Sequence, residues 1–193
     1  MTADQTTSRE PFRKDSRFPR PDPWLTAALP LLAAGLPGPA LDLACGRGQN
    51  ALCVAALGVE TVGMDASAEA LEAARLEARR RNLASSFVRA DAEEPATFSR
   101  AAGWGAVLVF HFLHRPLFRP LEDCLAPGGL LICKTHLDHP LRGPLARPRR
   151  AAFVLRPGEL LGAFPRLFPL AYREWAWGGE AYAALLARRP YSR

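Results

Sequence analysis

Three aspartates each follow an apolar run in the first half of the chain, and their positions point to a nucleoside ligand. Asp42 closes the run that starts at residue 40, Asp65 closes 59–64, and Asp91 follows 87–90. A carboxylate in such a place accepts hydrogen bonds from ribose hydroxyls or from an adenine amino group, and it attracts an ammonium or a sulfonium. We therefore predict a site for an adenosyl compound whose other end is positively charged.

A glycine-rich turn follows the first of these aspartates. Gly46 and Gly48 lie just before a helix that we expect near 49–57. Glycine adopts positive φ and lacks a Cβ, so the backbone can approach a ligand at the start of the helix. The same spacing with Ala51 satisfies the dinucleotide fingerprint, so the turn alone does not select a cofactor. Asp42 disfavours a dinucleotide because a pyrophosphate bound here would be repelled.

Titratable side chains gather after a further apolar run, 105–110. The imidazoles of His111 and His114 suit proton removal or substrate orientation, and Arg115 suits an anionic acceptor. A base is needed only when the molecule on which these residues act carries a proton that must be removed. We predict that these residues act in catalysis; the open alternative is that His114 and Arg115 cap the next helix.

Strands and helices alternate from residue 40, which predicts an α/β, Rossmann-like three-layer sandwich. A helix should begin after Ser67 and end at Asn82, because these are a good N-cap and a good left-handed terminator. Right-handed crossovers bring the carboxyl ends of parallel strands to one edge. The aspartates and the residues after Phe110 should meet there. The expected strands lie near 40–43, 59–64, 86–90, 105–110 and 129–135.

The two ends of the chain have different patterns. Residues 1–20 are polar and predict a mobile arm, followed by a helix near 25–34 that is broken at Pro30. A short helix near 157–164 precedes two apolar runs, separated by Gly178-Gly179, that predict a hairpin. We expect one domain over 21–193.

Four segments together resemble a known family. DLACGRG at 42–48, GMD at 63–65, DA at 91–92 and LAPGGLL at 125–131 resemble, in order and spacing, the motifs of class I S-adenosylmethionine-dependent methyltransferases. The resemblance covers about residues 25–136. Within that class, FHFLHRPL at 110–117 and VLRPGELL at 154–161 resemble the small bacterial tellurite-resistance methyltransferases.

The resemblance implies a seven-stranded, mostly parallel sheet with an antiparallel C-terminal strand, and S-adenosyl-L-methionine as the cofactor. Ala44 stands where many members carry the first glycine of the loop. Trp24 is a candidate lid over the methyl donor because the N-terminal segment folds across it in related enzymes; packing of the first helix is the alternative. The implied cofactor-binding residues are Asp42, Ala44, Cys45, Gly46, Gly48, Asn50, Asp65, Ala66, Asp91, Ala92, Phe110 and Trp24.

Composition excludes several classes of protein. The chain has 193 residues, 49% of them hydrophobic, and no apolar stretch of membrane-spanning length, so we expect a cytoplasmic monomer or homodimer. Its four cysteines lack Cys-x-x-Cys spacing, which argues against a zinc site and a disulfide framework. Two His-x-x-His pairs, at 111/114 and 136/139, have no evident third ligand, so we predict no metal.

The formal net charge of +6 and the pI near 9.7 raise the question of a nucleic-acid partner. Only Lys14 and Lys134 are lysines among the 25 basic residues, and the local arginine cluster at 142–150 has no interleaved aromatics. We therefore favour a methyltransferase acting on a small soft or anionic acceptor. The alternatives are an RNA methyltransferase, which would use the 142–150 loop, and a non-catalytic S-adenosylmethionine-binding protein.

Overall fold

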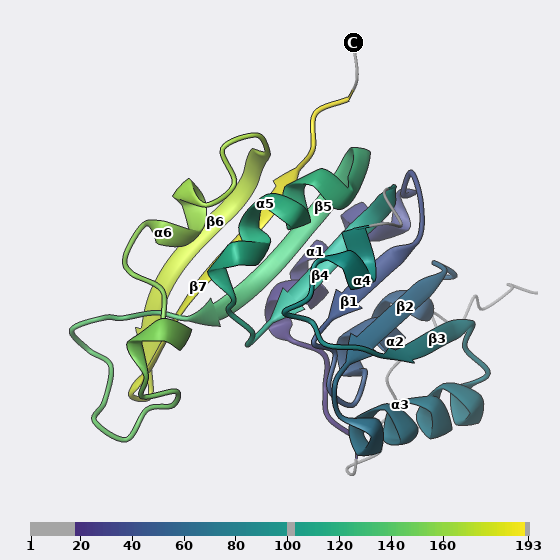
Figure 1. Cartoon of the computed structure of the whole chain (residues 1–193), viewed down its shortest axis with the longest axis horizontal. Coiled ribbons are helices and arrows are strands. Elements are labelled where there is room, and N and C mark those ends of the chain that lie inside the picture. Colours follow the sequence, from purple (N-terminus) through teal and green to yellow (C-terminus); the bar gives the residue numbers. More distant parts are fainter. Residues whose placement is uncertain (1–17, 100–102, 192–193) are drawn as a thin grey trace, which may run out of the picture.

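A seven-stranded sheet runs through the computed structural model, which describes residues 18–99 and 103–191 (Figure 1). The order across the sheet is β3-β2-β1-β4-β5-β7-β6, and β7 runs opposite to the other six strands. This confirms the predicted mostly parallel α/β sheet with an antiparallel C-terminal strand. The strands are β1 (Ala40–Leu43), β2 (Thr61–Asp65), β3 (Ser85–Arg89), β4 (Trp104–Phe110), β5 (Leu125–His136), β6 (Phe168–Trp177) and β7 (Glu180–Arg188).

Helices cover both faces of the sheet and give the three layers. Apolar side chains of β4 alternate between the faces: Leu108 packs with Leu25 of α1, whereas Val109 packs with Leu121 of α5. Figure 1 shows α4, α5 and α6 in front of the sheet and α1 behind it. The helices are α1 (Pro23–Ala33), α2 (Gln49–Ala55), α3 (Ala68–Arg81), α4 (Ala96–Ser99), α5 (Phe118–Cys124) and α6 (Glu159–Gly162), with 3-10 turns η1 (Arg115–Leu117) and η2 (Ala151–Phe153).

The ends of α3 follow the sequence signals. The Ser67 hydroxyl accepts a hydrogen bond from the Ala70 amide at 3.2 Å, and Asn82 ends the helix with φ of 53°. Leu71 and Ala74 are buried against the sheet, as the spacing of apolar residues predicts. Both predicted caps are confirmed.

The predicted break at Pro30 is wrong. α1 begins at Pro23, capped by Asp22, and continues through Pro30 to Ala33. Proline removes one helical hydrogen bond. Burial of Leu25, Ala28 and Leu32 on one face of α1 holds the helix together despite that loss.

The fifth strand begins at Leu125, earlier than its predicted start. β4 advances from Trp104 to Ala106 while β5 advances from Leu125 to Leu130. The turn at 127–129 therefore lies inside β5 as a bulge, where the extra residues leave the ladder without ending it.

The predicted C-terminal hairpin is confirmed as β6 and β7. β6 is the outer strand of the sheet, and its pairing with β7 shifts register between Pro169 and Ala171. Gly178 and Gly179 connect the two strands with positive φ angles of 61° and 80°. Leu185 and Ala187 of β7 lie in the core beside β5.

Two sequence predictions concern the start of the chain and membrane association. Of the predicted arm 1–20, residues 1–17 lie outside the described residues. Phe18 is half-buried, and its ring lies 5.8 Å from the Arg47 guanidinium and 5.2 Å from that of Arg81. Within the described segments 18–99 and 103–191, none of the helices has the length and apolarity required to span a bilayer.

Candidate active site

The site lies where the strand order reverses. β1 pairs with β2 on one side and with β4 on the other, so the connections after β1 and after β4 leave in opposite directions. In open α/β sheets, ligands bind in the crevice that this reversal opens at the carboxyl ends of the strands. The glycine turn follows β1, and His111 follows β4. The sheet thus brings the two predicted halves of the site together.

The turn after β1 has a tight backbone. Ala44, Gly46 and Gly48 adopt positive φ angles of 55°, 54° and 78°. A Cβ at Gly48 would lie 2.8 Å from the Phe87 ring, whereas a Cβ at Gly46 would meet no atom of the described chain within 4 Å. Gly48 therefore allows close packing inside the protein, and Gly46 leaves open space beside the loop. Ala44 accepts a left-handed conformation that is unfavourable for a residue with a Cβ.

Asp42 faces the helix that follows the turn. Its side chain is 1% exposed, and its Oδ2 accepts a hydrogen bond of 2.9 Å from the Ala51 amide. Burial raises the pKa of Asp42 to about 7; the Ala51 hydrogen bond opposes this rise, and the nearby Asp65 charge adds to it. The carboxylate thus accepts a hydrogen bond from a backbone amide at the start of α2 that a bound pyrophosphate would need as its own donor. This geometry disfavours a dinucleotide at the turn.

Two further aspartates lie along the same edge. Asp65 Oδ2 accepts from the Gly46 amide at 2.7 Å, and its Oδ1 accepts from the Ser67 amide at 2.8 Å. Each carboxylate oxygen has a second lone pair, so the half-buried Asp65 can still accept from two ribose hydroxyls. Asp91 is exposed and bonds the Glu93 amide.

The other residues predicted to bind the cofactor near these aspartates differ in their exposure. Ala66 is exposed and its carbonyl accepts from Arg89, whereas Ala92 is buried in the core. Cys45 is also buried. Phe110, at the end of β4, is 7% exposed and packs on the α1 side of the sheet.

The start of α1 connects the turn to the other half of the site. The Asp22 amide donates to the side-chain oxygen of Asn50 in α2 at 2.9 Å. Trp24, in the first turn of α1, packs at the edge of the core. Its Nε1 is buried without a hydrogen-bond partner in the part of the chain that the structure describes. An unpaired buried donor is unfavourable, and a ligand atom would relieve it.

His111 has an unusual backbone conformation and a carboxylate partner. Its φ is 56°, and its amide donates to the Lys134 carbonyl at 2.8 Å. The imidazole Nε2 lies 3.4 Å from Asp22 Oδ2, while the ring remains 44% exposed. Strained residues of this kind cluster at functional sites. The geometry holds one ring nitrogen at Asp22 and leaves the other free for a ligand.

A buried lysine shares that carboxylate. Lys134 Nζ donates to Asp22 Oδ2 at 2.8 Å and lies 4.6 Å from the centre of the Tyr182 ring and 5.6 Å from that of Trp175. Burial raises the pKa of Asp22, but hydrogen bonds from His111, Lys134 and the Trp24 amide outweigh it, so the net pKa is lowered. Asp22 is therefore ionised at neutral pH.

The other two predicted catalytic residues lie elsewhere. His114 Nδ1 is 3.7 Å from Glu93 Oε1, and the side chain makes no capping hydrogen bond to η1. Arg115 forms a two-point ion pair with Glu159, at 2.5 and 2.9 Å, and also donates to the carbonyls of Ala152 and Val154. This arginine therefore fixes the segment 152–159 against the end of β4.

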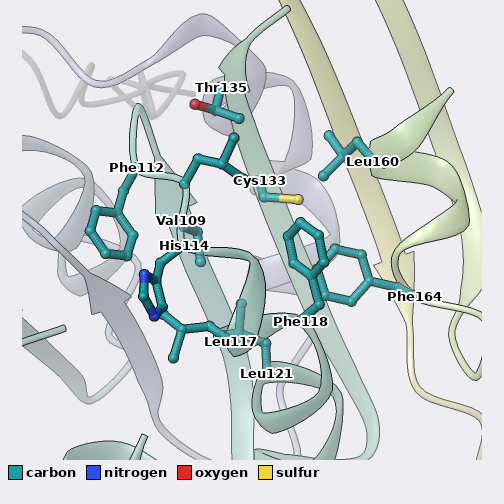
Figure 2. Close-up of a pocket in the computed structure, with 11 residues that line it drawn as sticks. Val109, Phe112, His114, Leu117, Phe118, Leu121, Cys133, Thr135, Leu160 and Phe164 are labelled. Atoms are coloured by element: carbon teal, nitrogen blue, oxygen red, sulfur yellow. The ribbon is translucent and has the colours of Figure 1, made fainter. Parts of the chain in front are cut away.

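Two cavities lie beside these residues, and only one of them has the volume to hold a small molecule. The first, drawn in Figure 2, lies among Val109, Phe112, His114, Phe118 and Phe164 and encloses about 20 Å³, room for a single water at most. The second, which we call the acceptor cavity, encloses about 420 Å³, the size of a small-molecule site. It is lined by His111, Phe112, Leu113, His136, Arg147, Pro148, Phe153, Glu180 and Tyr182.

The acceptor cavity has a largely aromatic wall. The ring centres of His111, His136 and Tyr182 lie 5.1 to 5.8 Å from one another. Burial lowers the pKa of His136, and the neighbouring His111 lowers it further, so His136 is neutral at pH 7. His136 Nδ1 and Glu180 Oε2, 3.7 Å apart, are buried without hydrogen-bond partners among the described residues. These atoms can receive polar groups of a ligand.

Sequence reasoning missed Asp22, Lys134 and Tyr182 as parts of the site. A signal existed for the first two: Asp22 precedes Pro23, which is a helix-start pattern, and Lys134 is the charged residue in the apolar run 130–135. No local pattern marked Tyr182, because strand pairing with β5 places it beside His136.

In the described residues, no group of three or more histidine, cysteine, aspartate or glutamate side chains could hold a metal ion. His139 Nδ1 accepts from the Leu141 amide at 3.1 Å. Cys45, Cys53, Cys124 and Cys133 are free and buried, and burial raises the pKa of the Cys53 thiol to about 12.

Comparison with known proteins agrees with this geometry. A family model described as a methyltransferase domain matches residues 40–129. TehB from Haemophilus influenzae aligns with a TM-score of 0.70 and 19% identity over 86% of this chain and 61% of that chain. A SAM-dependent methyltransferase from Methanosarcina mazei aligns with 0.67 and 17% over 90% and 100%. Geranyl diphosphate methyltransferase in complex with GPP and sinefungin aligns with 0.64 and 17% over 86% and 76%.

At these identities the solved structures establish the fold, and the chain spans less than two thirds of the TehB chain. A search of curated proteins finds no match. The family match covers the turn, the three aspartates and β4, whereas Asp22, Lys134 and Tyr182 of the site lie outside it. Residues 40–129 match a methyltransferase domain, and S-adenosylmethionine-dependent methyltransferases are among the solved structures that share the fold of the chain.

Proposed function

We propose that the chain transfers a methyl group in one in-line step to a small acceptor bound against His111. One observation carries the proposal: at the reversal of strand order the glycine turn follows β1, and His111, which pairs with Asp22, follows the adjacent β4 and lines a cavity of about 420 Å³. A donor site and an acceptor site thus lie at adjacent strand ends. Alignment of this kind lowers the barrier by roughly 7 to 11 kcal/mol.

The residues of the turn fit the cofactor. Open space at Gly46 fits the methionine part of S-adenosylmethionine. The free lone pairs of Asp65 fit its ribose, and the exposed carboxylate of Asp91 fits its adenine. The unpaired Nε1 supports Trp24 as the residue that covers it. We also propose that the cofactor contacts Ala44, Cys45, Gly48, Asn50, Ala66, Ala92 and Phe110. When bound, the cofactor supplies an electrophilic methyl group on a positively charged sulfur.

Asp42 acts on the ligand through its electric field. Because its carboxylate is buried against α2, it cannot reach far into the crevice. When Asp42 is ionised, its charge favours a cation in a partly dry site and disfavours a diphosphate, and a bound cation in turn favours the ionised form. This role gives a reason for an acid at a position where burial makes ionisation unfavourable.

His111 accepts the proton of the acceptor when the acceptor carries one. Asp22 lies 3.4 Å from Nε2, so it orients the imidazole and stabilises the charge that protonation creates. The leaving thioether needs no proton, so one base is enough. The aromatic wall of His136 and Tyr182 favours a small, soft or flat acceptor.

The proposal is tested by measuring release of S-adenosylhomocysteine with thiols, phenols and oxyanions as acceptors. We expect His111→Ala to lower turnover by about 10²-fold or more, the usual contribution of a general base, with an unchanged dissociation constant for S-adenosylmethionine. Asp22→Asn should lower turnover less. His139→Ala is the matched control, since that imidazole binds a backbone amide away from the cavity lining.

Equal turnover of the His111→Ala variant and the wild type would contradict the role of His111. A wild-type protein that binds S-adenosylmethionine tightly but methylates none of the acceptor classes would favour the non-catalytic alternative.

We further propose a cytoplasmic location and a monomeric or homodimeric active form. The free, buried cysteines are compatible with a reducing compartment. Cell fractionation and size-exclusion chromatography with light scattering test these two points.

A further inference from the structure

A second large cavity lies at the same edge of the sheet and is rich in arginine. It encloses about 320 Å³ and we call it the arginine cavity. Arg115 reaches it from the end of β4, and Asp138 reaches it from the end of β5. Its lining residues are Arg115, Asp138, Arg142, Arg149, Ala151, Val154 and Arg156.

The charges around this cavity do not cancel. Four arginines line it, against the carboxylates of Asp138 in the lining and of Glu159, which pairs with Arg115 at 2.5 Å and lies 3.7 Å from Arg156. The net formal charge is therefore +2. An electropositive, concave surface of this kind attracts an anion more strongly than scattered surface charges do.

Arg142 has an unused donor in this cavity. Its Nη2 donates to the Pro148 carbonyl at 2.5 Å, which fixes the guanidinium, but its Nε is buried without a partner among residues 18–99 and 103–191. A buried donor is rarely left unpaired unless a ligand or water completes the site. Arg149 is exposed and lines the same cavity.

The arginine cavity and the acceptor cavity share one segment of chain. Within 147–154, Arg149 and Val154 line the arginine cavity, whereas Arg147 and Phe153 line the acceptor cavity. The two cavities therefore lie next to each other along this segment.

We propose that the arginine cavity binds a phosphate group carried by the methyl acceptor. A phosphate monoester has a charge of about −2 at neutral pH and three strong acceptor oxygens, which complement the net charge and the forked donors of Arg142 and Arg149. RNA is disfavoured because the arginines converge on one cavity rather than following a strand along the surface. The inference rests on the proposed function, since it assigns the acceptor of that same site.

The test is calorimetric titration of inorganic phosphate and pyrophosphate into the full chain saturated with S-adenosylhomocysteine, at constant ionic strength. We expect the dissociation constant for each probe to rise about tenfold or more in Arg142→Ala and in Arg149→Ala, because each loses a charge-assisted hydrogen bond. Arg119→Ala is the matched control: its exposed guanidinium pairs with Asp123 on α5 and should leave binding unchanged.

Binding of phosphate that is equally weak in the wild type and in the Arg142→Ala/Arg149→Ala double variant overturns the inference. Loss of single-stranded RNA binding in the double variant, with phosphate binding unaffected, overturns it in favour of a nucleic-acid surface. The methylation assay is then repeated with phosphate added, using an acceptor found in the screen. If phosphate raises the KM for that acceptor, the two compete for one site, which supports the inference. If the KM for the acceptor is unchanged, the bound phosphate is a separate effector, and the assignment is overturned.

Titration of S-adenosylhomocysteine alone separates this inference from the proposed function. Failure of the wild type to bind it contradicts the methyltransferase site, whereas normal binding without phosphate binding contradicts the arginine cavity alone. Arg149 is exposed, so Arg149→Ala should fold normally, and an unchanged circular dichroism melt checks this.

Discussion

The Asp42→Asn substitution tests how the first aspartate is held in the protein. Burial raises the pKa of Asp42 to about 7, compared with 3.8 for a free aspartate. Between these values the folded protein keeps a proton that the unfolded chain has released. The free energy of unfolding therefore falls as the pH rises from about 4 to about 7, and the asparagine variant lacks this loss.

The size of the effect follows from the two pKa values. At about 1.36 kcal/mol per pKa unit, the whole interval corresponds to about 4 kcal/mol, and the part between pH 5 and pH 8 to about 3 kcal/mol. The stability gained by Asp42→Asn should thus be larger at pH 8 than at pH 5 by about 3 kcal/mol. Other titrating groups are common to both proteins and cancel in this comparison.

Urea unfolding of both proteins at pH 5 and pH 8, without cofactor, measures this difference. Asp138→Asn serves as the control because its carboxylate is exposed. A gap between wild type and Asp42→Asn that is the same at the two pH values would refute a buried, protonatable Asp42. In the cofactor assay the same variant should bind S-adenosylmethionine more weakly, because it lacks the negative charge.

Three further predictions concern the turn, α1 and the buried ion pair. Gly48→Ala should lower the free energy of unfolding by about 2 to 4 kcal/mol, because the new Cβ would overlap the Phe87 ring and φ is positive. Gly46→Ala introduces only the backbone strain of a positive φ, so it should lower the free energy of unfolding by about 1 to 2 kcal/mol in the same urea experiment. Trp24→Ala should weaken S-adenosylmethionine binding, and an unchanged calorimetric dissociation constant would remove Trp24 from the site. Lys134→Met should cost about 3 to 5 kcal/mol at pH 7 by leaving the Asp22 carboxylate poorly compensated, and this cost should shrink as the pH falls through the lowered pKa of Asp22.

The donor half of the site could be predicted because its signals are local. Asp42 lies one residue before the end of β1 and Asp65 is the last residue of β2, so both aspartates mark the carboxyl edge of the sheet. Ser67 and Asn82 likewise mark the ends of α3. Parallel topology then fixes which ends meet.

The acceptor half depends on contacts between distant parts of the chain. Lys134 and Asp22 are separated by 112 positions, and Tyr182 joins them through the pairing of β7 with β5. The predicted helix break at Pro30 was wrong because burial of one face of α1 in the core outweighs the local effect of a proline. Side-chain partners such as Glu159 for Arg115 also cannot be read from spacing.

The irregular outer strand has a consequence for how the sheet meets other chains. Among the strands of the described residues, β6 is the outermost and its far backbone edge has no partner strand. A proline at 169 removes one donor from this edge, and the register shift beside Ala171 bends it. An incoming strand would find an interrupted, twisted template instead of a continuous ladder. Extension of the sheet into fibrous or edge-to-edge aggregates is thereby discouraged at the very strand where exposed Phe168 and Leu170 would otherwise promote it.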